Sequence, residues 1–165
     1  MTPAISLDEL LAWSQESSRF WKEHFDANPV LLELPCSIDN SGTVLGLVRH
    51  IWVADLRWAQ RIGGLPLQSR EELPTGPLEA LYGLHRQAAA IFKALLDHPE
   101  QDWETILTLD YDWLPPQARA ASRRKLLLHA LLHSQRHWAQ MATLLRTAGY
   151  PSDFKGDMIL SAVLG

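Results

Sequence analysis

Residues 126–140 read LLLHALLHSQRHWAQ and carry His129, His133 and His137 at every fourth position of a leucine-rich run. Four residues advance an α-helix by about 6 Å and turn it about 40° past a full circle, so neighbouring histidines can share one metal ion. His129 and His137 would lie about 12 Å apart along the axis, too far for bonds of about 2.0–2.1 Å to one ion. The stretch therefore predicts a helix with two metal ligands, and a third ligand must come from elsewhere in the chain.

Length and charge restrict the class of protein. The 165 residues suffice for a substantial core, and we expect a single domain over residues 1–165. The 15 basic and 19 acidic side chains give a formal net charge of −4, which offers a phosphate backbone little attraction and argues against nucleic acid as a partner. The chain opens without a signal-peptide pattern, and no stretch approaches the roughly 18 apolar residues of a membrane span. We therefore expect a soluble, cytoplasmic protein without membrane contact.

Apolar residues recur with helical spacing in four stretches. The pattern predicts helices from Ser6 to about Phe25, from after Asn40 or Ser41 to about Ile62, from Pro77 to near Pro99, and from after Pro116 to about Thr147. Between the last two, the alternation in residues 104–110 predicts a short strand. The polar residues 65–76 indicate a connection over the surface. The fold class is therefore all-α, a helical bundle with minor extra segments.

His50 is the best candidate for the third ligand. It lies in the middle of the second expected helix, on an apolar face with Leu47, Val53, Ala54 and Trp58. Sites in bundles are built from side chains of facing helices, so His50 could meet His133 and His137. Three imidazoles leave one coordination position open, as in catalytic zinc sites. The alternative is that these histidines are ordinary core or surface residues, but an unpaired polar ring on an apolar face would be costly.

Several other residues receive structural interpretations. We place His129 beside the ligands or in the core, and expect His24, His85 and His98 to meet solvent. Asp55 follows His50 by five residues, hence about 140° around the helix, and is interpreted as a surface charge. Trp52, Trp58 and Trp138 could wall a pocket near the histidines, although the bundle core is the favoured place for them. The lone Cys36 is interpreted as a small buried hydrophobe.

Two motifs resemble the DinB-like superfamily. One is the run from His50 to Trp58, HIWVADLRW, and the other is His129-x-x-x-His133-x-x-x-His137-x-x-Gln140 followed by Leu144 to Gly149. The resemblance implies an up-and-down bundle of four main helices that binds one divalent metal through His50, His133 and His137. Where the family often has His-Arg-Gly-Gln, this chain has His137-Trp138-Ala139-Gln140, so packing beside the metal differs.

Relatives of this fold include thiol-dependent S-transferases and isomerases. The resemblance therefore implies a metal-dependent enzyme that activates a small thiol for transfer to an electrophile, with His129 and Gln140 orienting ligands or substrate. It also implies a homodimer that uses a low-molecular-weight thiol. The alternatives are a metal-dependent hydrolase using metal-bound water and a non-catalytic metal-binding or dimeric interaction protein. Imidazole ligands suit zinc first, with nickel or iron as further options.

Overall fold

Capping residues determine where the helices begin. In the computed structural model, which describes residues 5–112 and 114–163, helix α1 (Leu7–Ala27) opens with the expected capping box. The backbone N–H of Glu9 donates to Ser6 Oγ at 3.1 Å, and the backbone N–H of Ser6 donates to the Glu9 carboxylate at 2.6 Å. Helix α2 (Val44–Ile62) is capped by Thr43, and helix α3 (Leu78–Asp97) follows Pro77. These helices begin within a few residues of their predicted starts.

The fourth helix is shorter than predicted. Helix α4 (Arg123–Thr147) is capped by Ser122, because residues between Pro116 and Ser122 take other conformations. They form the 3₁₀ helix η3 (Pro116–Ala118) and the strand β4 (Ala120–Ser122), which pairs in antiparallel fashion with β3 (Ile106–Thr108). The predicted short strand is therefore present, and its pairing delays the start of α4. The chain is mostly helical, which confirms the all-α class.

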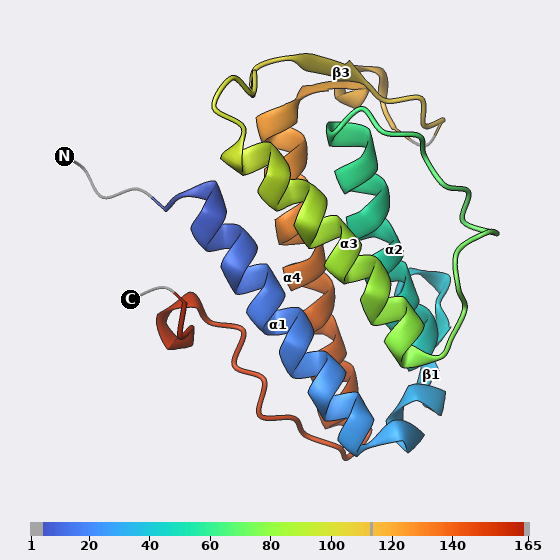
Figure 1. Ribbon diagram of the computed structural model, residues 1–165. Coiled ribbons are helices and arrows are strands. Elements are labelled where there is room, and N and C mark those ends of the chain that lie inside the picture. Colours follow the sequence, from blue (N-terminus) through green and yellow to red (C-terminus); the bar gives the residue numbers. More distant parts are fainter. Residues whose placement is uncertain (1–4, 113, 164–165) are drawn as a thin grey trace.

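The remaining elements are short and lie at the helix ends. Between α1 and α2 the chain forms η1 (Pro29–Glu33), the antiparallel pair β1 (Pro35–Cys36) and β2 (Gly42–Thr43), and η2 (Ile38–Asn40) between these strands. After α4 it forms η4 (Met158–Leu160). Figure 1 shows β3 at one end of the helices and β1 at the other.

Helices α2 and α3 run in the same direction. Trp52 packs against Tyr82 with ring centroids 5.4 Å apart, and three residues further on Asp55 contacts His85. Because the contacts follow the same order along both helices, the helices are parallel. Residues 63–77 must therefore return along the length of the bundle before α3 begins. Figure 1 shows this crossover on the outside of α2. The simple up-and-down order expected from the resemblance is therefore wrong: the helix directions along the chain are down, up, up, down.

Hydrogen bonds fasten this crossover (residues 63–77) along α2. Near the end of α2, the Arg57 guanidinium donates to the carbonyl oxygen of Gln68. Near its beginning, Arg49 donates to the carbonyl oxygens of Arg70 at 2.5 Å and Pro74 at 2.9 Å. The crossover thus passes α2 in the opposite direction to the helix. These arginines therefore hold the crossover against α2 along most of its length.

The core lies between the four helices and contains large rings. Trp21, Trp52 and Trp138 are fully buried, and the rings of Trp21 and Trp138 stack with centroids 5.7 Å apart. Trp52 and Trp138 are therefore core residues. Cys36 is buried in the same core, as the sequence predicted. No described helix has both the length and the apolar character that a membrane span requires.

Candidate metal centre

His50, His133 and His137 meet where α2 faces α4. The two helices are antiparallel neighbours, so the middle of α2 lies opposite the middle of α4. His50 Nε2 lies 3.4 Å from His133 Nε2, and His137 Nε2 lies 3.2 Å from the same atom. One ligand atom from each residue lies within 4.8 Å of the other two. A tetrahedral ion with bonds of about 2.0–2.1 Å would place its ligands about 3.3–3.4 Å apart, so the three histidines are positioned to hold a metal ion.

Asp39 is a functional candidate that sequence reasoning missed. Its Oδ2 atom lies 2.8 Å from His50 Nδ1, on the side of the ring away from Nε2. Asp39 and the next residue, Asn40, have φ values of 51° and 55°, and this left-handed turn forms η2 ahead of α2. Aspartate and asparagine tolerate that conformation better than most residues. Two consecutive residues of these types before a helix were the available signal.

Burial keeps the three rings neutral. Removal from water lowers the pKa of His50, His133 and His137, since the protonated ring loses more solvation than the neutral one. The effect is largest for His133, whose pKa falls to about 3 with further contributions from the neighbouring rings. Neutral imidazoles are the form that binds metals. The rings are therefore ready for metal at neutral pH without prior loss of a proton.

Arg136 places a cation beside the centre. Its Nη2 atom lies 3.1 Å from His137 Nε2, so the guanidinium donates to the lone pair that a metal would use. Its charge also lowers the pKa of His50, His133 and His137, after the larger effect of burial. Arg136 thus opposes a cation at this position, while the Asp39 carboxylate favours one.

A cavity of about 450 Å³ opens onto His50 and His133. Trp58, Tyr111 and His129 form part of its wall. Of the three tryptophans considered as pocket walls, only Trp58 is in this position. A larger cavity of about 790 Å³ lies further along α4 against β1 and η2, and no histidine is among the residues that line it. The chemistry of the histidine cluster is therefore accessible from the smaller cavity.

His129 and Gln140 lie near the cluster without joining it. The ring of His129 packs on Trp58 with centroids 5.2 Å apart and approaches the ring of His133 at 5.8 Å. The Gln140 side chain lies close enough to His137 to raise the pKa of its ring, against the larger effect of burial. Both residues are therefore neighbours of the cluster, as the sequence predicted for His129.

A second polar cluster joins α2, α3 and α4 in the interior. Asp55 Oδ2 lies 3.0 Å from His85 Nδ1, and the Ser134 hydroxyl donates to Asp55 Oδ1 at 2.5 Å. Asp55 and His85 are each 4% exposed. The sequence-based placement of both at the surface is therefore wrong, because α2 has packed neighbours on two sides. Ser134 directly follows His133 in the sequence. Its hydrogen bond to Asp55 therefore also holds α4 against α2 beside a candidate metal ligand.

The donor set fits a divalent ion: three neutral imidazoles converge, and one ring is oriented by a carboxylate. Comparison with protein families finds that the DinB family matches residues 7–154. A search of curated proteins finds no match.

Proposed function

The chain belongs to the DinB family, and from this premise we propose that it is a metal-dependent enzyme with one divalent ion on His50, His133 and His137. The reaction we infer is transfer of a small thiol to an electrophile. The observation that carries the proposal is the convergence of three imidazole rings beside a cavity, with His133 Nε2 lying 3.4 Å from His50 Nε2 and 3.2 Å from His137 Nε2. Three protein ligands leave a coordination position for substrate, which is the arrangement of catalytic zinc sites.

The chain's own residues have separate tasks in this proposal. A divalent ion in this position lowers the pKa of a thiol or water molecule and so supplies a nucleophile at neutral pH. Asp39 holds the His50 ring with Nε2 toward the cluster. His129 and Trp58 line the cavity from which the substrate approaches. Zinc is the ion we expect, and nickel and iron also accept imidazole ligands.

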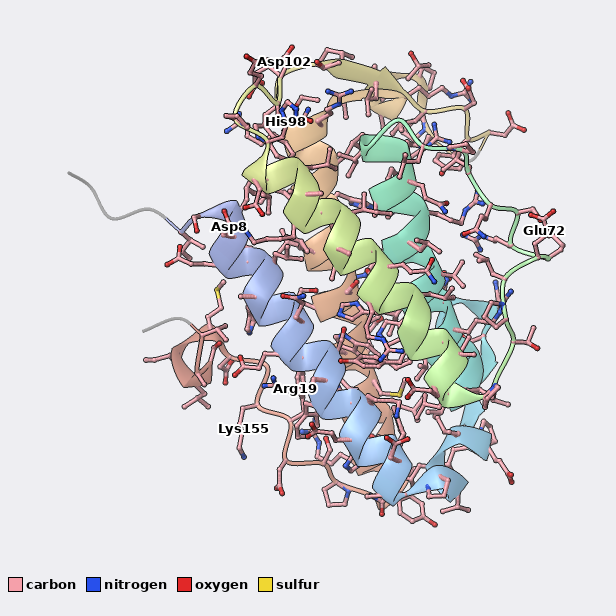
Figure 2. All side chains as sticks on the ribbon, in the orientation of Figure 1. Asp8, Arg19, Glu72, His98, Asp102 and Lys155 are labelled. Carbon is pink, nitrogen blue, oxygen red and sulfur yellow. The ribbon has the colours of Figure 1, made fainter. Side chains whose placement is uncertain are left out.

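Metal content of untagged protein tests the centre. We expect about one equivalent of metal by mass spectrometry in the wild type, and loss of that metal in His50→Ala and His133→Ala. The matched control is His98→Ala, because His98 is exposed and Figure 2 shows it at the end of α3, near Asp102. A wild type that stays empty after incubation with zinc, nickel and iron would contradict the proposal.

Turnover assays then test the reaction. Metal-loaded protein is mixed with electrophiles in the presence and absence of a low-molecular-weight thiol. Consumption of the electrophile that requires the thiol supports transfer, whereas consumption in its absence points to hydrolysis. No turnover with either would leave a metal-binding or interaction protein. The family resemblance also supports a homodimer, which light scattering during gel filtration measures directly.

A further inference from the structure

We propose that the cavity beside His50 and His133 recognises an anionic group of the substrate, a carboxylate or phosphate, through Arg57, Arg70 and Arg136. This inference rests on the proposed function, because it names the substrate class of the same site. All three arginines line the cavity of about 450 Å³. The whole chain has a formal net charge of −4. The cavity therefore concentrates positive charge in a protein that is otherwise acidic.

Carboxylates of residues 5–112 and 114–163 leave these three guanidinium groups unpaired. Among the residues that the structure describes, no Asp or Glu oxygen forms an ion pair with any of them. Among the described residues that line the cavity, Asp39 is the acidic one, and its carboxylate contacts His50 Nδ1. A guanidinium carries five N–H donors in a planar fork that matches a carboxylate or phosphate. Most of these donors are therefore available to a ligand.

The arginines come from three elements that the fold holds in place. Arg57 lies on α2 and is fastened to the Gln68 carbonyl, while Arg136 lies on α4 beside His137. Arg70 lies on the crossover, where Arg49 binds its carbonyl oxygen at 2.5 Å. The backbone positions of all three residues, and the guanidinium group of Arg57, are thus fixed before a ligand arrives, which lowers the entropy lost on binding. This arrangement favours the interpretation that the three arginines form an anion-binding site over the interpretation that they lie together by chance.

The same cavity connects the arginines to the metal-binding atoms. His50 and His133 line it, and their Nε2 atoms lie 3.4 Å apart. Its volume is within the range of about 300–1,000 Å³ that is typical of small-molecule sites. A molecule that fills it can present a donor atom to the histidine cluster and an anionic group to the arginines. We therefore expect a substrate that carries both groups, such as a thiol with a carboxylate.

Two thiols of different charge test this proposal. Full-length protein loaded with Co(II) is titrated with mercaptosuccinate, which has two carboxylates, and with neutral 2-mercaptoethanol, and thiolate binding is followed by cobalt charge-transfer absorption. We expect mercaptosuccinate to bind at least about 10-fold more tightly, the size of one charge-assisted hydrogen bond. Competition by succinate and by inorganic phosphate distinguishes the two kinds of anion. Equal affinity for both thiols would overturn the anion site.

Arginine variants locate the effect. Arg57→Gln and Arg70→Gln should each weaken mercaptosuccinate binding about 10-fold and change 2-mercaptoethanol binding by less than about 2-fold. Arg146→Gln is the matched control, because Arg146 is an exposed residue of α4 that does not line the cavity. Equal losses for both thiols would show a structural effect and would contradict the proposal.

Failure of the metal centre is measured separately. The metal content of every sample is determined first, so an empty wild type identifies failure of the proposed function. In that case succinate and phosphate are titrated into the metal-free protein by calorimetry. Binding of either anion that weakens in Arg70→Gln and persists in Arg146→Gln supports the anion site. Absence of binding to the wild type overturns it.

Discussion

The Nδ1 atom of His50 lies 2.8 Å from Oδ2 of Asp39. This contact places the ring proton on Nδ1 and leaves the lone pair of Nε2 for another partner. His133 and His137 differ from His50, since their buried Nδ1 atoms have no hydrogen-bond partner in the described part of the chain. Among the three candidate ligands, only His50 is thus oriented by a carboxylate.

Removal of this carboxylate should weaken metal binding. We expect Asp39→Ala to lower zinc affinity about 10- to 100-fold, the usual cost of losing an orienting partner of a histidine ligand. Competition with a chromophoric chelator measures the affinity. Asp8→Asn is the control, because Figure 2 shows Asp8 near the beginning of α1, and its side chain is 56% exposed. Unchanged zinc affinity in Asp39→Ala would show that the contact has no part in metal binding.

Removal of the neighbouring cation should have the opposite effect. The guanidinium of Arg136 competes for the lone pair of His137 Nε2 and repels a cation, so Arg136→Gln should bind zinc about 3- to 10-fold more tightly at low salt. The gain should shrink as salt screens the charge. Arg146→Gln, on the same helix, should leave the affinity unchanged. Weaker zinc binding in Arg136→Gln would mean that the arginine helps to form the centre.

The buried cluster of Asp55, His85 and Ser134 should contribute to stability. Asp55→Ala leaves His85 and Ser134 without their partner, and we expect the free energy of unfolding to fall by about 3–5 kcal/mol. Ser134→Ala should cost less, about 1–3 kcal/mol. Urea denaturation followed by tryptophan fluorescence measures both changes, with Asp8→Ala as the exposed control. A cost below about 1 kcal/mol for Asp55→Ala would contradict this role.

Acid should destabilise the metal-free protein through His133. Its folded-state pKa of about 3 lies below the ordinary value of 6.5, so the unfolded chain takes up the proton first as pH falls. This stabilising contribution is complete above about pH 6.5 and decreases by about 1.4 kcal/mol for each pH unit below it. Denaturation between pH 7 and pH 5 should show a decrease in the wild type to which His50 and His137 also contribute, because burial lowers their pKa values too. His133→Gln should reduce the slope, whereas His98→Gln should preserve it.

The sequence predicted the histidine cluster because its signal is local. Spacing of four residues between His133 and His137 places both on neighbouring turns of one helix, and the apolar face around His50 pointed to a facing helix. Asp39 could not be found in this way. It comes from an irregular segment, and only the turn at η2 brings it to His50.

Helix directions and the burial of Asp55 depended on information that a single helix does not contain. Periodicity assigns α2 one apolar face, but the fold covers α2 with α3 on one side and α4 on another. Asp55 therefore points to a neighbouring helix and contacts His85. Residues 63–77 have the sequence of a polar surface connection whether α2 and α3 are antiparallel or parallel. Their course along α2 is shown by the contacts of Arg49 and Arg57.

The residues of the candidate site differ in how well they tolerate substitution, because some lie on core helices and Arg70 lies on the crossover. The candidate metal ligands project from helices whose other faces fill the core, so most substitutions around them disturb the whole protein. Arg70, by contrast, stands on an exposed strip of irregular chain that is fastened mainly through backbone carbonyls. Side chains on such a strip can be exchanged while its path is kept. A new substrate preference could therefore evolve, or be engineered, by exchanging the exposed side chains of residues 65–76 while Leu73 stays in the core.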